Sequence, residues 1–263
     1  MQEQTIQNQA TPAQGPIYAA PHADIDLWVV CLKASADAAE RCYATLSQDE
    51  KDRAARFRFA PHRQNYVLGR AILRILIGRY LSIRPAAVTF SYGANGKPAL
   101  LDSSSPIRFN SSHSGNTALY AFTQNGELGV DIEQIRPVEY IEEIADRFFC
   151  REEARELRSL PPSQRLTAFF RCWTRKEAYV KAVGGGLSIR LDSFRVTLLP
   201  RDRPALIGIE NSTRYTEPWT IHDVRTVTGF AAALAYPGNP RSLNENPPVQ
   251  VDNIFAILEQ DSR

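Results

Sequence analysis

The chain has 263 residues, of which 43% are hydrophobic and 23% charged, and its formal net charge at pH 7 is +2. This composition is typical of a globular protein and excludes a fibrous or disordered chain, and the small net charge disfavours nucleic acid as a partner of the whole molecule. No stretch approaches the roughly 20 apolar residues of a membrane span, and the N-terminus lacks the regions of a secretory signal. The four cysteines form no C-x-x-C pair, which favours a reducing cytoplasm over a zinc site or a disulfide framework.

Ordered structure is expected from about Asp24 to about Pro237. Residues 1–23 are rich in Gln, Ala and Pro and predict a mobile N-terminal tail. Residues 238–263 begin with turn-forming residues and are expected to form a C-terminal tail, whose apolar piece at 254–258 either docks on the body or frays.

The first half of this body, 24–125, alternates between strands and helices. A β-rich run predicts a strand at 25–32, and Ser47 followed by Glu50 is a capping-box pattern that predicts the start of a helix. Apolar residues at helical spacing predict a long helix over 64–81. Further short strands are expected at 88–92, 107–110 and 118–123.

The second half, 126–237, repeats this alternation, so we expect an α/β (α+β) fold. A strand is expected at 129–132 and a helix over 140–160. A second long helix over 163–183 ends at the glycines 184–186. Closing strands are expected at 194–199, 219–224 and 229–236.

Two acids lie a strand step apart in GVDIE, residues 129–133. Asp131 and Glu133 would project from one face of a strand, with Val130 and Ile132 packing the other. Adjacent carboxylates repel each other unless a cation lies between them, and Mg²⁺ prefers oxygen ligands of this kind. Two surface acids at a solvated strand end explain the motif alone about equally well.

A glutamate and a lysine share one helical face in WTRKEAYVKA, residues 173–182. Glu177 and Lys181 are four residues apart, and an ordinary surface pair of this kind contributes only about 0.5 kcal/mol. Taken alone, that ordinary pair is the better interpretation. The glycines that follow lack phosphate-loop spacing and indicate a helix C-cap.

Two polar segments are candidates for binding phosphate. In FNSSHSG, residues 109–115, a strand is expected to run into a tight turn, and its hydroxyls, amides and His113 can cradle phosphate oxygens. The alternative is a polar turn in which His113 bonds a local carbonyl. In YGANGKPAL, residues 92–100, a turn presents Lys97 before Pro98, which is equally consistent with a surface lysine.

A basic block without Asp or Glu runs from Arg53 to Arg84. Its arginines are at positions 53, 56, 58, 63, 70, 74, 79 and 84. Because the planar guanidinium binds phosphate through two donors, the block fits a polyphosphate ligand or a nucleic acid, or else it forms several separate solvated faces. The aromatic residues among the arginines look like core residues, which disfavours stacking on nucleic-acid bases.

The motifs GKP, FNSSHSG, GVDIE, FFCREE and WTRKEAYVKAVGGGL occur in this order. Together they resemble the surfactin-type (Sfp-type) 4′-phosphopantetheinyl transferases over about residues 25–236. The resemblance implies two similar α/β halves related by a pseudo-twofold, with the active site in the cleft between them. The N-terminal half would bind coenzyme A, and the C-terminal half would carry the metal and the catalytic carboxylates.

The resemblance also implies the reaction and its partners. Such enzymes transfer the 4′-phosphopantetheine arm of coenzyme A to a serine hydroxyl of an apo acyl or peptidyl carrier protein and release adenosine 3′,5′-bisphosphate. The reaction requires Mg²⁺, with Mn²⁺ as the expected substitute. The two-halved length favours a monomer, without a nucleic-acid or membrane partner.

Site residues follow from the resemblance position by position. The implied metal ligands are Asp131, Glu133 and Glu177. The implied catalytic residues are Glu153 as general base (or the adjacent Glu152), Lys181 at the departing phosphate, Glu177 and His113. The implied coenzyme contacts are Arg53, Lys97, Pro98, Ser112, His113, Lys176 and Lys181, with Arg63 and Arg70 as further contacts.

Three other functions compete with this prediction. A non-catalytic module that binds carrier proteins or coenzyme A needs no base, so the full set of acids and lysines disfavours it. A nucleic-acid binder leaves the carboxylates unexplained. A magnesium-dependent phosphohydrolase would release bisphosphate from coenzyme A without any carrier protein.

Overall fold

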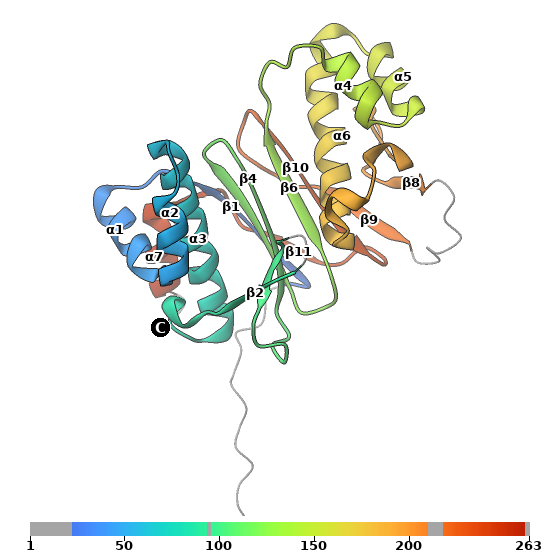
Figure 1. Cartoon of the computed structure of the whole chain (residues 1–263). Coiled ribbons are helices and arrows are strands. Elements are labelled where there is room, and N and C mark those ends of the chain that lie inside the picture. The colour runs from blue at the N-terminus through green and yellow to red at the C-terminus, as the bar shows by residue number, and fades with distance from the viewer. Residues whose placement is uncertain (1–22, 94–95, 210–217, 261–263) are drawn as a thin grey trace, which may run out of the picture.

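The computed structural model describes residues 23–93, 96–209 and 218–260, so nearly all of the expected N-terminal tail lies outside the described residues. Two sheets lie next to each other in the middle of the molecule, and helices cover the outer side of each (Figure 1). Among the helices in the described ranges, none is long and apolar enough to cross a membrane.

The first sheet contains strands from both ends of the described chain. Its order is β11-β1-β5-β4, and β12 also pairs with β1. β5 is antiparallel to both β1 and β4, whereas β11 and β12 run parallel to β1. The strands are β1 (Ile25–Cys31), β4 (Arg108–Ser114), β5 (Thr117–Thr123), β11 (Leu243–Glu245) and β12 (Val249–Gln250).

Four helices cover the outer side of this sheet (Figure 1). They are α1 (Ala36–Thr45), α2 (Gln48–Ala55), α3 (Ala60–Leu81) and α7 (Val251–Gln260). α2 begins at the predicted capping box, where the Ser47 backbone N–H donates to Glu50 Oε2 at 3.0 Å. α3 begins four residues before the predicted start, because Pro61 fits the first turn of a helix, where an N–H has no intrahelical partner.

The segment after Pro237 corrects the predicted end of the ordered body. β11, β12 and α7 all lie in this segment, which we expected to form a tail. Val251 and Ile254 are completely buried in the core that α3 forms with the first sheet. Burial of these apolar side chains, together with backbone pairing to β1, explains why the segment is ordered.

The second sheet has the order β6-β10-β9 and is antiparallel throughout. Its strands are β6 (Gly129–Gln134), β9 (Trp219–Asp223) and β10 (Phe230–Pro237), and its helices are α4 (Ile141–Phe148), α5 (Arg151–Ser159) and α6 (Pro162–Val183). The helix expected over 140–160 is therefore two helices. The chain is extended at Phe149 and Cys150, and Glu153 accepts a hydrogen bond from the Cys150 N–H to start α5.

Smaller elements complete the fold. β2 (Phe90–Tyr92) pairs with β3 (Pro98–Leu100), and residues 94–95 of the turn predicted at 92–100 lie outside the described residues. A second small ladder joins β7 (Phe194–Val196) and β8 (Leu206–Ile209). The short 3₁₀ helices are η1 (Pro85–Ala87), η2 (Gly186–Ser188) and η3 (Leu191–Ser193).

The two sheets pack on each other through an apolar layer, and β4 lies beside β6 at its edge (Figure 1). Val130 and Ile132 of β6 belong to this layer, as the alternation in GVDIE predicts. Asn110 Oδ1 of β4 accepts a hydrogen bond from the Val130 N–H at 2.9 Å, and Ser114 Oγ accepts one from the Gln134 N–H at 3.1 Å. Side chains of β4 therefore fix the position of β6.

Candidate active site at the junction of the two sheets

Two carboxylates of β6 face serine hydroxyls of β4. Ser112 Oγ donates to Asp131 Oδ1 at 2.8 Å, and Ser114 Oγ donates to Glu133 Oε2 at 2.6 Å. Each pair combines side chains two residues apart on its strand, so the strand alternation repeats across the junction. The serines thus orient both acids of GVDIE.

A lysine of α6 joins these acids. Lys181 Nζ donates to Asp131 Oδ1 at 2.6 Å and to Ser112 Oγ at 2.9 Å. α6 can reach β6 because Gly129 has no side chain: a Cβ at Gly129 would lie 2.2 Å from the carbonyl oxygen of Ala178. The structure therefore places Lys181 with Asp131, Glu133 and Ser112.

Glu177 precedes Lys181 by one turn of α6 and completes an acidic cluster. Burial is the main cause that raises the pKa of Glu177, and the negative charges of Asp131 and Glu133 add to it, whereas Lys181 acts in the opposite direction. The pKa of Glu133 is raised chiefly by burial and also by Asp131. Three carboxylates and one ammonium thus share the junction, with more negative than positive charge.

The oxygen donors of this cluster fit a magnesium ion. Asp131 Oδ2 is buried and accepts no hydrogen bond from the described residues. As they stand, the described His, Cys, Asp and Glu side chains include no group of three that could hold a metal. Because Mg²⁺ is commonly bound through one or two carboxylates together with phosphate oxygens and water, three converged protein ligands are not required.

The FNSSHSG motif differs from the prediction in its backbone. Residues 111–114 lie in β4, and the turn starts only at Gly115, whose φ is 54°. A cradle of turn amides is therefore wrong for the serines, whose hydroxyls serve Asp131 and Glu133 instead. β-Pairing of β4 with β5 continues to the end of the motif and keeps it extended.

His113 lines a large cavity between β1, α2 and α3. The cavity has a volume of about 840 Å³, and its basic lining residues are Lys33, Arg53, His62 and His113. The pKa of His113 is lowered by partial burial of the ring and then by the positive charge of Lys181, so the imidazole is neutral at pH 7. Two predicted coenzyme contacts, Arg53 and His113, therefore share one cavity.

Lys97 and Pro98 lie apart from this cavity. Neither residue lines the cavity that holds Arg53 and His113. Lys97 Nζ donates to the carbonyl oxygen of Lys181 at 3.0 Å and lies 3.4 Å from Glu127 Oε2, while Pro98 begins β3. The structure thus links Lys97 to the end of α6 and not to the cavity that contains Arg53 and His113.

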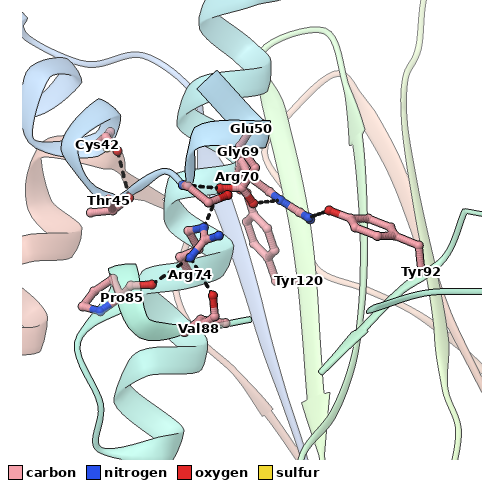
Figure 2. A network of polar contacts seen from close by, with 11 residues as sticks. Cys42, Thr45, Glu50, Gly69, Arg70, Arg74, Pro85, Val88, Tyr92 and Tyr120 are labelled. Carbon is pink, nitrogen blue, oxygen red and sulfur yellow. Dashed lines mark hydrogen bonds and ion pairs between the residues drawn. The ribbon is translucent and has the colours of Figure 1, made fainter. Parts of the chain in front are cut away.

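Part of the basic block stabilises the fold. Figure 2 shows Arg70 and Arg74 of α3 converging on the buried Glu50 carboxylate, at 2.5 and 2.6 Å. Arg74 also donates to the carbonyl oxygens of Pro85 and Val88. Arg70 reaches the Tyr92 hydroxyl and, on its other side, lines a smaller cavity of about 140 Å³ with Ser112 and His113. The block is therefore no continuous binding surface.

The structure does not bring Glu153 and Lys176 to the acidic cluster. Both side chains are completely buried, and Lys176 Nζ lies 2.7 Å from Glu153 Oε2. Glu153 also accepts hydrogen bonds from the N–H groups of Cys150 and Val196. The structure thus holds both side chains in the core, away from the acidic cluster, and the roles of Glu153 as general base and of Lys176 as a coenzyme contact stay predictions. The alternative base, Glu152, is exposed and pairs with Arg155.

Two residues of the site have roles that the sequence did not predict. Ser114, which orients Glu133, is indicated by strand alternation only once residues 111–114 are known to be extended. Lys33, in the cavity wall, follows the end of the first strand and carries no motif of its own.

Two family models match the chain. A model described as "4'-phosphopantetheinyl transferase superfamily" matches residues 127–235, and one described as "4'-phosphopantetheinyl transferase, N-terminal" matches residues 33–125. The two matches together span most of the described residues.

Curated relatives carry the same description. The chain is 42% identical to the 4′-phosphopantetheinyl transferase HetI of Nostoc sp. over 218 residues, which are 82% of this chain and 88% of the relative. It is 33% identical to the 4′-phosphopantetheinyl transferase Sfp of Bacillus subtilis over 159 residues, 60% of this chain and 69% of the relative. A solved holo-(acyl-carrier-protein) synthase from Bacillus anthracis, in complex with CoA, is similar over 43% of this chain and 96% of its own, with 24% identity and a TM-score of 0.35.

Proposed function

From the membership of the chain in the 4′-phosphopantetheinyl transferase superfamily, we propose that it transfers the 4′-phosphopantetheine arm of coenzyme A to a serine hydroxyl of apo acyl or peptidyl carrier proteins. The observation that carries the proposal is the cluster of Asp131, Glu133, Glu177 and Lys181 beside a basic cavity. The reaction needs carboxylates that bind a metal ion and accept a proton, and cationic side chains that bind phosphate groups.

The two halves of the chain have different roles in the proposed reaction. The half at 24–125, whose cavity contains Arg53 and His113, holds the nucleotide end of coenzyme A. The half at 126–237 supplies the acidic cluster. Arg53 offers a planar pair of donors to phosphate oxygens, and the neutral His113 donates one hydrogen bond.

Asp131, Glu133 and Glu177 would hold Mg²⁺, or Mn²⁺ in its place. The ion would neutralise the pyrophosphate and polarise its phosphorus–oxygen bonds. The unpartnered buried oxygen of Asp131 and the raised pKa values of Glu133 and Glu177 support this assignment, because a divalent cation relieves both.

The reaction then requires one proton acceptor and one stabilised leaving group. A bond forms between the carrier serine oxygen and the phosphorus next to the pantetheine, and the bond from that phosphorus to the bridging oxygen breaks. Because Asp131 and Glu133 together with phosphate oxygens and water can hold the ion, Glu177 accepts the serine proton when its own carboxylate is not on the metal. Lys181, held against Asp131 and Ser112, stabilises the charge on the departing adenosine 3′,5′-bisphosphate.

We place Lys97 and Pro98 next to the pantetheine arm of bound coenzyme A. Lys97 bonds the carbonyl oxygen of Lys181 and thereby sets the end of α6 that carries this lysine. We place the enzyme in the cytoplasm, supported by four free cysteines, three of which are buried. We also propose that it is a monomer, supported by the two α/β halves that a single chain supplies.

The alternative, a module that binds carrier proteins or coenzyme A without catalysis, receives less support. Burying three carboxylates together costs free energy, because each disfavours ionisation of the others. A binding module has no use for such a cluster, whereas a metal-dependent transfer does.

Intact-mass spectrometry of apo carrier proteins incubated with coenzyme A and Mg²⁺ tests the proposal. We expect a phosphopantetheine-sized mass gain that a chelator abolishes and that Asp131→Ala slows by about 10² or more. Asp202→Ala, at an exposed acid beside the first half of α6 and outside the cluster, is the matched control and retains the rate. Binding of coenzyme A without any mass gain would instead favour the binding module, and bisphosphate release without a carrier would favour a phosphohydrolase.

A further inference from the structure

One wall of the cavity is a short connection between β1 and α1. Leu32, Lys33 and Ala34 form this wall and face Arg53 and His113. Within the first sheet, the Leu32 N–H donates to the carbonyl oxygen of Asn116 at 2.7 Å. The wall carries a cation but belongs to neither a helix nor a strand, so its position depends on what holds its two ends.

Residues of the C-terminal segment 243–255 hold both ends of this wall. Before the wall, β12 pairs with the end of β1, with Val249 opposite Val30 and Gln250 opposite Cys31. After the wall, the backbone N–H of Ser35 donates to both carboxylate oxygens of Asp252, each at 3.2 Å.

Residues next to Asp252 are anchored in the core. Its neighbours Val251 and Ile254 are completely buried in the helical core, and the Arg41 guanidinium lies 3.9 Å from the centre of the Phe255 ring. The hydrogen bonds from Ser35 are the main cause that lowers the pKa of Asp252, so its carboxylate is ionised at neutral pH. An ionised acceptor makes a stronger bond to an N–H than a neutral one.

We propose that Asp252 is a positioning residue for the coenzyme cavity: it holds residues 32–35 so that Lys33 stays in the cavity wall. The inference rests on the proposed function in placing coenzyme A in this cavity. It gives the C-terminal segment a role in substrate binding, although its residues do not line the cavity.

Asp252→Ala is expected to weaken coenzyme A binding and leave the chemistry intact. When the wall occupies its binding position only a tenth of the time, the apparent Kd rises about tenfold, because affinity falls with the competent fraction. KM for coenzyme A rises with it, and kcat at saturating coenzyme A stays close to that of the unaltered protein. Asp252→Asn, which keeps one acceptor oxygen, recovers part of the affinity.

The chain offers a matched control at the opposite end of the same segment. Asp24 Oδ2 accepts hydrogen bonds from Ser242 N at 3.0 Å and from Ser242 Oγ at 2.8 Å, at the end of β1 away from the wall. Asp24→Ala therefore removes a similar carboxylate anchor of the C-terminal segment without touching residues 32–35.

Isothermal titration with coenzyme A and amide hydrogen exchange of residues 32–35 test the inference on the full chain. We expect weaker binding and faster exchange of the Ser35 amide in Asp252→Ala, and neither change in Asp24→Ala. If Asp252→Ala binds coenzyme A as tightly as Asp24→Ala does, the positioning role is wrong. Failure of the unaltered protein to bind coenzyme A, or unchanged binding in Arg53→Ala, would instead refute the proposed use of the cavity.

Discussion

The buried pair of Glu153 and Lys176 gives a sharp prediction, because it separates a structural role from a catalytic one. Lys176→Met removes the cationic partner of the Glu153 carboxylate in a site where neither side chain has any exposed surface. It also removes the donor to the carbonyl oxygens of Leu191 and Phe194. The variant therefore deprives one buried carboxylate of its counter-charge and two carbonyl oxygens of a hydrogen-bond donor.

The expected loss of stability follows from these contacts. Breaking a buried ion pair by removing one partner costs about 3–5 kcal/mol. For a chain of this size, each kcal/mol lowers Tm by roughly 2–4 °C, so Lys176→Met should lower Tm by about 6–20 °C. The double variant Glu153→Gln with Lys176→Met removes both charges together and should recover much of this loss.

Urea unfolding of the two single variants and the double variant measures the coupling between the residues. The control is Glu152→Ala, whose carboxylate is 48% exposed and pairs with the 72% exposed Arg155, so its effect should stay within about 0.5 kcal/mol. If Glu153→Gln unfolds at the same urea concentration as the unaltered protein but loses 10² or more in kcat, our reasoning is refuted and Glu153 is the base.

Three further predictions concern the acidic cluster. In metal-free protein at pH 7, Glu177→Gln should raise Tm, because the raised pKa of Glu177 means that its ionised form destabilises the fold. This gain in Tm should vanish as the pH falls through the raised pKa of the folded protein to the unfolded value near 4.5, and a Tm difference that persists below that pH would contradict the assignment. Ser114→Ala should weaken Mn²⁺ binding, measured by electron paramagnetic resonance, by about 10–100-fold, because Glu133 loses its donor; unchanged affinity would remove Glu133 from the metal ligands. Gly129→Ala should cost about 1–3 kcal/mol in urea unfolding, because the new Cβ meets the Ala178 carbonyl oxygen at 2.2 Å and pushes α6 from β6; wild-type stability would show that the two elements separate freely.

Patterns that depend on neighbouring residues predicted much of the fold. The apolar spacing along α3 and α6, the capping box of α2 and the alternation in β6 all appear in the structure. α1 was missed because it buries only Ala38 and Cys42, so it has no apolar stripe to detect. The family resemblance is confirmed by the matches over most of the chain.

Contacts between distant residues set the limits of prediction for the site. Asp131, Glu133, Glu177 and Lys181 were found because strand and helix periodicity places them in pairs. The sequence could not show that Glu153 lies apart from this cluster, because the local pattern around a glutamate at the start of a helix is the same whether it faces solvent or a buried lysine. The anchoring of residues 32–35 by Asp252 joins positions more than 200 apart in the chain, and no local pattern reports it.

The pairing of β1 with β11 and β12 has a consequence for synthesis of the protein. Among the described strands the ribosome completes β1 first and its partner β5 after β4, but the partners on the other edge of β1 emerge only after the described strands of the second sheet have been made. The nascent protein therefore exposes this edge of β1 until β11 and β12 have been made, and an unpaired strand edge can pair with other chains. The described strands and helices of the second sheet all lie between residues 129 and 237, so the strand pairing of this sheet can form before β1 pairs with β11 and β12, although β1 was translated earlier.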